Sequence, residues 1–209
     1  MIYIDHRRNT ILQLKDTLTE YGVEVDIRSY NDQLILHHEP YLIGESFENW
    51  LKHFRHQFLI LNIKEEGLEE RIIELMKKFN IRHYFFLDQS FPFLIKWSRF
   101  GESKCAVRVS EFESIETALT LKGRIDWIWV DYFNYFPLSK ESANKLKSAG
   151  FKLCLVSPEL QGYPYESEIP KLAHLLKDQE IFPEAICTKK PEIWKKWFLE
   201  IKGDQTKIL

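Results

Sequence analysis

Acidic side chains recur at a spacing suited to chemistry in one short stretch of this sequence, residues 21–40. Glu24 and Asp26 alternate with apolar residues, so in a β-strand both carboxylates point to the same side, two residues apart. Neighbouring carboxylates repel each other, and their burial is costly unless a cation lies between them. Two interpretations follow: Arg28 supplies the cation in an internal ion pair, or a divalent metal ion binds the pair.

The same stretch also brings imidazole groups close to these acids. After a turn near Asn31, the apolar run 34–36 leads to His37, His38 and Glu39. Acid and imidazole groups therefore converge within one segment, as proton-transfer chemistry requires. If the strand continues through His38, alternation turns His37 and His38 to opposite faces.

The elements that position these groups alternate between strand and helix along the whole chain. Strands are expected at residues 2–4, 22–28 with a hairpin-like extension to 38, 58–63, 84–87, 105–109, 127–130, 152–156 and 185–187. Helices are expected at residues 10–21, 47–54, 68–79, 93–97, 113–121, 139–149, 172–176 and 192–201. Eight strands thus alternate with eight helices.

This alternation predicts an α/β protein, a compact single-domain (β/α)8 TIM barrel over residues 1–202, with residues 203–209 as a tail prone to fraying. A doubly wound open sheet is the alternative. The barrel places catalytic groups at the carboxyl ends of its strands. Polar residues lie in or just after the strands, as this fold requires: His6, Glu24, Asp26, Asn62, Lys64, Asp88, Arg108, Asp131, Ser157 and Thr188.

The composition is that of an ordinary globular protein, with 44% hydrophobic residues in 209. A net charge of -2 argues against a nucleic acid or an anionic membrane as a bulk partner. Cys105, Cys154 and Cys187 lie far apart in apolar runs, which indicates buried thiols in a reducing compartment. No secretory signal or transmembrane run is seen, so a soluble, cytoplasmic protein is expected.

A series of short motifs occurs in a fixed order: His6-Arg7 with Asn9-Thr10, Glu24-Val25-Asp26, Asp32, His38-Glu39-Pro40 and Asn62-Ile63-Lys64. Weaker similarity continues through residues 106–113 and 186–191. In order and strand placement, these motifs resemble the glycerophosphodiester phosphodiesterases, in the barrel superfamily that includes phosphatidylinositol-specific phospholipase C.

The resemblance implies an enzyme, a metal-dependent phosphodiesterase that hydrolyses a glycerophosphodiester-like P–O bond in a small substrate. It implies His6 and His38 as the acid/base pair, and Glu24, Asp26 and Asn62 as ligands of a divalent cation. Such hard oxygen ligands suit Mg2+ or Ca2+. It also implies phosphate contacts for Arg7 and Lys64. Arg108 is a further candidate, because a guanidinium matches two phosphate oxygens.

Some positions depart from the family pattern. Asn62 stands where the family usually has a third carboxylate, which predicts weaker metal binding. Glu39 replaces an aspartate after His38 and the preceding loop is one residue shorter, so His37 competes for the catalytic role. Arg108 is equally well placed to pair with Glu111 or Glu113.

Two other functions remain open. One is a sugar-phosphate enzyme that uses Lys64 for Schiff-base or proton-transfer chemistry, since burial makes a lysine more reactive. The other is a non-catalytic barrel that binds a phosphorylated ligand or a partner protein, which the amide at Asn62 favours.

Overall fold

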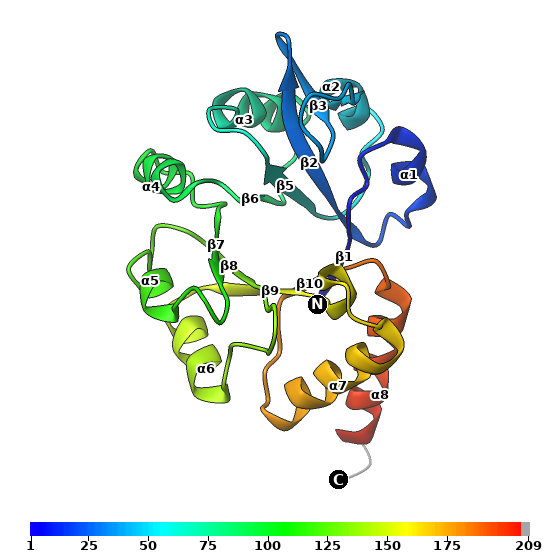
Figure 1. Ribbon diagram of the computed structural model, residues 1–209, viewed down its shortest axis with the longest axis vertical. Helices are drawn as coiled ribbons and strands as arrows, with labels where there is room; N and C mark the ends of the chain where they lie inside the picture. Colours follow the sequence, from blue (N-terminus) through cyan, green and yellow to red (C-terminus); the bar gives the residue numbers. More distant parts are fainter. Residues whose placement is uncertain (206–209) are drawn as a thin grey trace. The chain divides into compact units, whose positions relative to one another are not determined.

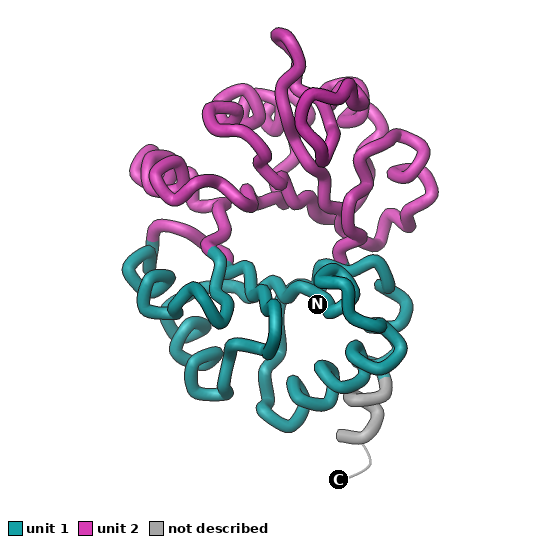
Figure 2. Tube along the Cα trace, viewed as in Figure 1, with its two compact units in different colours: residues 1–3, 108–123, 128–209 teal, residues 4–107, 124–127 magenta. Residues whose placement is uncertain are grey.

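The structure is a computed structural model that describes the backbone of residues 1–205 and the side chains of residues 1–199. Two compact units, each built from discontinuous segments, make up the chain (Figure 2). Unit 1 comprises Met1–Tyr3, Arg108–Gly123 and Ile128–Leu209, and unit 2 comprises Ile4–Val107 and Arg124–Trp127. The single domain over residues 1–202 remains a prediction.

Unit 2 holds the amino-terminal elements (Figure 1). Its strands are β1 (Ile2–Asp5, which begins in unit 1), β2 (Gly22–Tyr30), β3 (Gln33–Leu36), β4 (Glu45–Ser46), β5 (Leu59–Ile63) and β6 (Tyr84–Leu87). Its helices are α1 (Ile11–Asp16), α2 (Phe47–Leu51), α3 (Glu69–Lys78) and α4 (Phe91–Arg99). The strand β7 (Ala106–Val109) passes from unit 2 into unit 1.

Unit 1 holds the later elements. They are α5 (Ile115–Leu119), β8 (Trp127–Val130, which begins in unit 2), α6 (Lys140–Ser148), β9 (Lys152–Val156), the 3-10 helix η1 (Pro158–Gln161), α7 (Tyr165–Asp178), β10 (Ala185–Thr188) and α8 (Pro191–Gln205). Helix α8 includes residues 203–205, part of the segment expected to fray. Residues 206–209 lie outside the described part of the chain.

Strand β2 is the centre of unit 2, because it pairs in parallel with β1 and β5 and in antiparallel with β3. Strand β5 in turn pairs in parallel with β6. The carboxyl ends of β1, β2, β5 and β6 therefore lie at one edge of the sheet, where the predicted site residues are found. In unit 1, β9 and β10 are parallel neighbours.

Local sequence accounts for these elements. Every residue of β5 is buried, as expected for a continuous apolar run covered on both faces. Helix α1 begins with a capping box, in which Thr10 Oγ1 accepts from Gln13 N at 3.2 Å and Gln13 Oε1 accepts from Thr10 N at 3.1 Å. Ser46 caps α2 by accepting from Asn49 N. Cys105, Cys154 and Cys187 are buried, as predicted.

The α/β class and the eight predicted strands are confirmed, with β3 and β4 forming the hairpin after β2. Helix α1 ends earlier than expected, at Asp16, and α7 begins earlier, at Tyr165. An isolated parallel bridge joins Phe86 of β6 to Cys105, the residue before β7, and the closed barrel remains a prediction. Within the described residues, no helix combines the length and hydropathy of a membrane-spanning segment.

One prediction concerns Trp50, which is fully buried and donates from Nε1 to Arg8 O at 2.9 Å. Trp50→Phe leaves that carbonyl without its partner, so we expect a loss of about 1–3 kcal/mol in the free energy of unfolding. Trp97→Phe is the matched control, because the Trp97 indole N–H meets no acceptor among the described residues. Urea unfolding of both variants measures the difference, and equal losses would contradict the prediction.

Candidate active site

The site is built around Glu24 and Asp26, which are both fully buried on β2. The register places Asp26 directly opposite Asn62 on β5. Because alternate residues of a strand share a face, Glu24, Asp26 and Asn62 lie on the same side of the sheet. This confirms that the two carboxylates point the same way.

Glu24 receives hydrogen bonds at both carboxylate oxygens. Arg7 N donates to Oε2 at 2.8 Å, and Asn62 Nδ2 donates to Oε1 at 2.9 Å. His6 Nε2 lies 3.7 Å from Oε2. Burial raises the pKa of Glu24 to about 7, with the charge of Asp26 acting in the same direction and these hydrogen bonds opposing it. Glu24 is therefore poised to gain or lose a proton near neutral pH.

Asp26 is surrounded by donors and cations instead. Asn9 Nδ2 donates to Oδ2 at 2.9 Å, and Asn9 Oδ1 accepts from Asp26 N at 2.9 Å. Arg7 Nε lies 3.3 Å from Oδ2, and Lys64 Nζ lies 3.3 Å from Oδ1. A cation therefore lies beside each carboxylate oxygen of Asp26.

The loop after β1 holds Arg7 and Asn9 in place. Arg7 has a left-handed backbone with φ of 59°, which is uncommon for a residue with a side chain. The hydrogen bond from Arg7 N to Glu24 and that from Trp50 to Arg8 O hold the loop on both sides of this residue. The strained conformation thus persists because its neighbours fix it.

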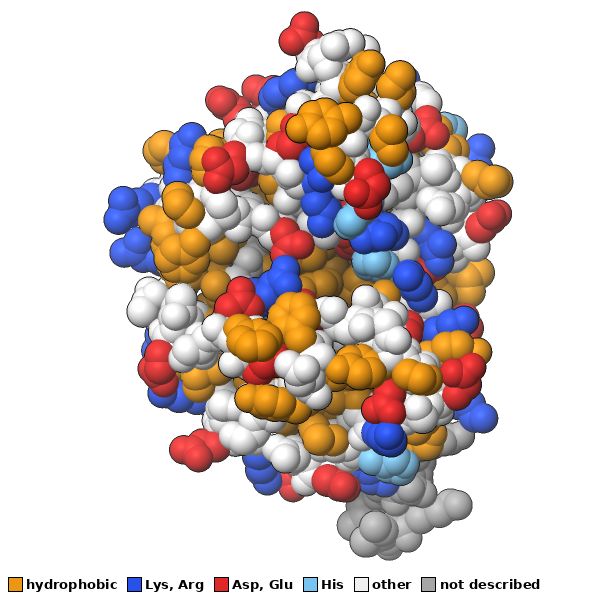
Figure 3. All heavy atoms as spheres, in the orientation of Figure 1, with side chains coloured by type: hydrophobic (Ala, Val, Ile, Leu, Met, Phe, Trp, Pro, Cys, Tyr) orange, Lys and Arg blue, Asp and Glu red, His pale blue; other side chains and the backbone are white. Residues whose placement is uncertain are grey.

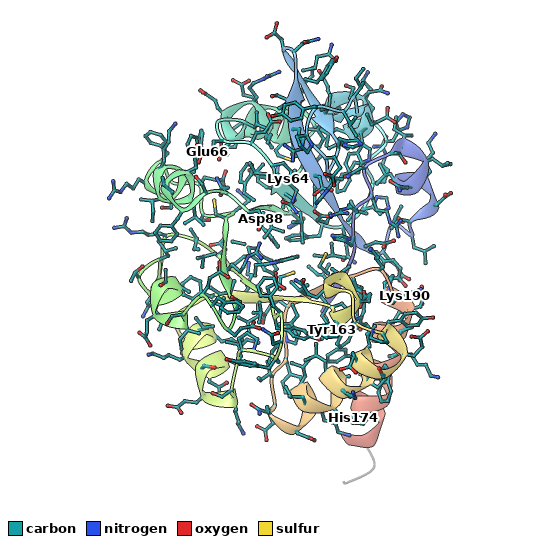
Figure 4. The ribbon with its side chains drawn as sticks, in the orientation of Figure 1. Lys64, Glu66, Asp88, Tyr163, His174 and Lys190 are labelled. Atoms are coloured by element: carbon teal, nitrogen blue, oxygen red, sulfur yellow. The ribbon has the colours of Figure 1, made fainter. Side chains whose placement is uncertain are left out.

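Lys64 follows β5 and links Asp26 to Asp88, which follows β6. Its Nζ lies 3.7 Å from Asp88 Oδ2, and Figure 4 shows the two side chains near each other in unit 2. Asp88 also has a left-handed backbone, with φ of 56°. Lys64 is therefore shared between the buried acid and a more exposed one.

Arg28 does not supply the cation between Glu24 and Asp26, so that interpretation of the sequence is wrong. Its guanidinium donates from Nε and Nη2 to His38 O at 3.0 and 2.9 Å, and its Nη1 lies 3.5 Å from Glu65 Oε1. Arg28 instead fixes the backbone that carries His38.

The predicted separation of His37 and His38 is also wrong. Strand β3 ends at Leu36, so alternation stops there, and both histidines line a pocket of about 350 Å3 together with Arg7. Gly44 closes this pocket from the next loop, where a Cβ would overlap the backbone carbonyl of Leu36.

The two histidines have different partners. His38 Nδ1 donates to Glu39 Oε1 at 2.5 Å, and this hydrogen bond lowers the pKa of Glu39. His37 Nδ1 lies 3.0 Å from Glu39 N, which donates to it. On the face drawn in Figure 3, histidine side chains lie among Lys and Arg side chains on the surface of unit 2. An anion would be attracted to such a surface.

Arg108 belongs to unit 1, where it pairs with Asp131 and lies near Glu113. Its Nη1 donates to Asp131 Oδ2 at 2.9 Å, and its Nε lies 3.9 Å from Glu113 Oε2. The pairing with Glu113 is one of the two considered, while Glu111 accepts from the backbone of residues 133 and 134. Its role as a phosphate contact remains a prediction.

The donor set around Glu24 suits a hard divalent cation. Asn62 Oδ1 is buried and accepts no hydrogen bond from any described residue, so an oxygen beside the two carboxylates is available as a ligand. Among residues 1–205, no group of three or more His, Cys, Asp or Glu side chains is arranged to hold a metal. Glu24, Asp26 and Asn62 would offer a cation three oxygen ligands with only two charges, and Asp26 already lies 3.3 Å from Lys64 Nζ.

No role was predicted for Asn9, although it makes two hydrogen bonds with Asp26. A signal was present, since Asn9 follows the first strand in the motif His6-Arg7-x-Asn9-Thr10. Asp88 was expected just after a strand, and it lies there, with its carboxylate beside Lys64.

Solved structures with the same fold are known. The structure matches a glycerophosphodiester phosphodiesterase from Agrobacterium tumefaciens with a TM-score of 0.67 and 12% identity, over 94% of this chain and 98% of that one. It matches a glycerophosphoryl diester phosphodiesterase from Parabacteroides distasonis with a TM-score of 0.65 and 12% identity, over 96% and 86% of the two chains. This chain has the fold of those enzymes. The sequence matches no protein-family model and none of the curated proteins.

The raised pKa of Glu24 predicts how stability depends on pH in metal-free buffer. The folded protein holds a proton on Glu24 up to about pH 7, whereas the unfolded chain releases it near 4.5. Stability therefore falls as pH rises from about 4.5 to 7, by roughly 3 kcal/mol for this group. Urea unfolding at pH 5 and pH 8 with a chelator should show a shallower fall in Glu24→Gln. The exposed control Glu141→Gln should retain the wild-type dependence, and a wild-type dependence in Glu24→Gln would refute the assignment.

Proposed function

We propose that this protein is a metal-dependent phosphodiesterase that hydrolyses a glycerophosphodiester-like P–O bond. The observation that carries the proposal is the buried Glu24–Asp26 pair beside His6, Arg7 and Lys64, in a chain with the fold of phosphodiesterases of that class. Acid, imidazole and fixed cations are the groups that phosphodiester hydrolysis needs.

In this proposal, Arg7 and Lys64 stabilise the negative charge of the phosphodiester. A phosphodiester is an anion whose negative charge grows on the equatorial oxygens during displacement, and preorganised cations stabilise that change. Arg7 is 41% exposed at its side chain, so its guanidinium remains available to a phosphate while its Nε faces Asp26. Lys64 is held by Asp26 and Asp88 and adds a second positive charge.

His6 and His38 are proposed to move the protons. In-line displacement at phosphorus places the entering and leaving oxygens on opposite sides, so one imidazole serves each. Glu24 Oε2 lies 3.7 Å from His6 Nε2, close enough to orient the ring and to exchange a proton with it. His38 donates from Nδ1 to Glu39, so its Nε2 is the atom that exchanges a proton with the substrate.

Glu24, Asp26 and Asn62 would hold the divalent cation, Mg2+ or Ca2+. When bound, such an ion polarises a phosphoryl oxygen as a Lewis acid. The closed (β/α)8 barrel is also part of this proposal, because the structural similarity spans nearly the whole chain.

The contacts of Lys64 argue against the sugar-phosphate alternative. A Schiff-base lysine must be neutral to attack a carbonyl, and two carboxylates lie within 3.7 Å of Lys64 Nζ. Borohydride trapping with carbonyl substrates tests this, since an adduct at Lys64 would overturn the phosphodiesterase proposal.

The function itself is tested by a substrate screen. Glycerophosphodiesters and bis(4-nitrophenyl) phosphate are incubated with the protein and Mg2+, Ca2+ or Mn2+, and release of alcohol is measured. We expect turnover that a chelator abolishes. Phosphate-ligand binding with no turnover of any diester would favour the non-catalytic alternative instead.

Metal binding predicts a calorimetric difference between the wild type and Asp26→Asn. Titration of Mg2+ or Ca2+ should show weak binding to the wild type, because the ligands carry only two charges. Asp26→Asn should weaken it at least tenfold. Equal heats and affinities in the two proteins would remove the metal from this pair.

The histidine pair predicts non-additive kinetics. His6→Ala and His38→Ala should each lower kcat by about 10²–10⁴-fold, and the double variant should be little worse than either single one. Circular dichroism confirms that the fold is intact. His37→Ala measures which histidine of the shared pocket acts: a larger loss there than in His38→Ala would transfer the role to His37, and full rates in His6→Ala and His38→Ala would refute the mechanism.

A further inference from the structure

A second pocket opens at the carboxyl ends of β5 and β6 in unit 2. Its volume is about 240 Å3, and acidic residues dominate its lining: Ile63, Lys64, Glu65, Glu66, Glu69, Asp88 and Ser90. Figure 4 shows Lys64, Glu66 and Asp88 on this side of unit 2. Four of the lining residues carry a carboxylate; Lys64 lies beside Asp88 and Arg28 beside Glu65, which leaves Glu66 and Glu69 as the excess negative charges.

Buried oxygens in and beside this pocket accept no hydrogen bond from any described residue. Glu69 is 0% exposed, and while its Oε1 accepts from Gln89 Nε2 at 3.0 Å, its Oε2 has no such partner. The same holds for Gln89 Oε1 and Ser90 Oγ. Ser90 precedes α4 but its side chain makes no capping hydrogen bond. A buried acceptor without a donor is costly, which indicates a ligand that supplies donors.

The chemistry of these acceptors selects the ligand. A primary ammonium brings three N–H donors and a positive charge, which match a negative pocket with several unsatisfied oxygens. A phosphate would be repelled by Glu69 and Asp88. A quaternary ammonium has the charge but no N–H, and an uncharged hydroxyl has one donor and no charge.

The pocket adjoins the proposed active site at Lys64. Lys64 lines the pocket and lies 3.3 Å from Asp26, while Arg7, on the other carboxylate oxygen of Asp26, lines the histidine pocket. Two pockets therefore flank the place where a phosphodiester would bind, one for each of its two ester substituents.

We propose that the acidic pocket binds the primary ammonium of the substrate's amino alcohol, so that the preferred diesters carry a short aminoalkyl group such as ethanolamine. This assignment rests on the proposed phosphodiesterase function. A volume of about 240 Å3 accommodates a chain of two or three carbons and its ammonium. Glu69 is then a specificity-determining residue, with Ser90 as a second acceptor.

The first experiment compares kcat/KM for glycerophosphodiesters of ethanolamine, choline and glycerol, which separate charge from N–H donors. The wild type should prefer ethanolamine over the other two by roughly ten- to hundredfold, as expected for one or two charge-assisted hydrogen bonds. Glu69→Gln should lower the ratio of ethanolamine to glycerol at least tenfold, and Ser90→Ala should lower it less. Glu74→Gln, on the exposed face of α3, should keep the wild-type ratio.

The second experiment needs no turnover. Ethanolamine hydrochloride is titrated into the wild type and Glu69→Gln and followed by NMR, with choline and Mg2+ as competitors. Saturable binding in the wild type, weakened at least tenfold in Glu69→Gln, supports the ammonium site even where no diester is hydrolysed, in which case the proposed function alone fails. Hydrolysis with no preference among the three diesters overturns the ammonium site and leaves the phosphodiesterase intact. Binding of Mg2+ in place of ethanolamine, lost in Glu69→Gln, also overturns it.

Discussion

The buried pair of Glu24 and Asp26 is the constraint on which unit 2 depends. Two carboxylates two residues apart on a fully buried strand can coexist only if other groups neutralise them, because an unpaired buried charge costs several kcal/mol. Glu24 is accommodated by its raised pKa and by two hydrogen bonds. Asp26 is accommodated by the cations of Arg7 and Lys64. The loops after β1 and β5 are thereby drawn to β2. The same neutralising groups are those that an anionic substrate would use.

Local periodicity was enough to predict the strand and the shared face of its acids, since both depend on residues two apart. It could not predict which cation compensates them. Arg28 lies on the same strand and was the obvious candidate, yet the cations come from Arg7 and Lys64, which are distant in sequence. Long-range partners of this kind are set by strand register and loop geometry, which no local pattern contains.

His37 and His38 show that local periodicity also fails as a predictor where a strand ends. Alternation would separate His37 from His38, but β3 ends one residue earlier and both line one pocket. The acidic pocket beside β5 and β6 was also beyond prediction, because Glu69 reads in the sequence as an ordinary acid in the first turn of a helix. In the proposed function, the histidine pocket and the acidic pocket would each receive one ester substituent of the diester.

The close contact of Gly44 with Leu36 limits how this site can change over evolutionary time. No residue with a Cβ fits position 44 without moving the backbone of β3, and that backbone continues into His37 and His38. Single substitutions of Gly44 are therefore not tolerated in this wall of the histidine pocket. The adjacent residues Tyr41, Leu42 and Ile43 are largely exposed and bear no such restriction. A change in substrate selectivity at the histidine pocket would have to come from substitutions at these exposed rim residues, while Gly44 stays unchanged.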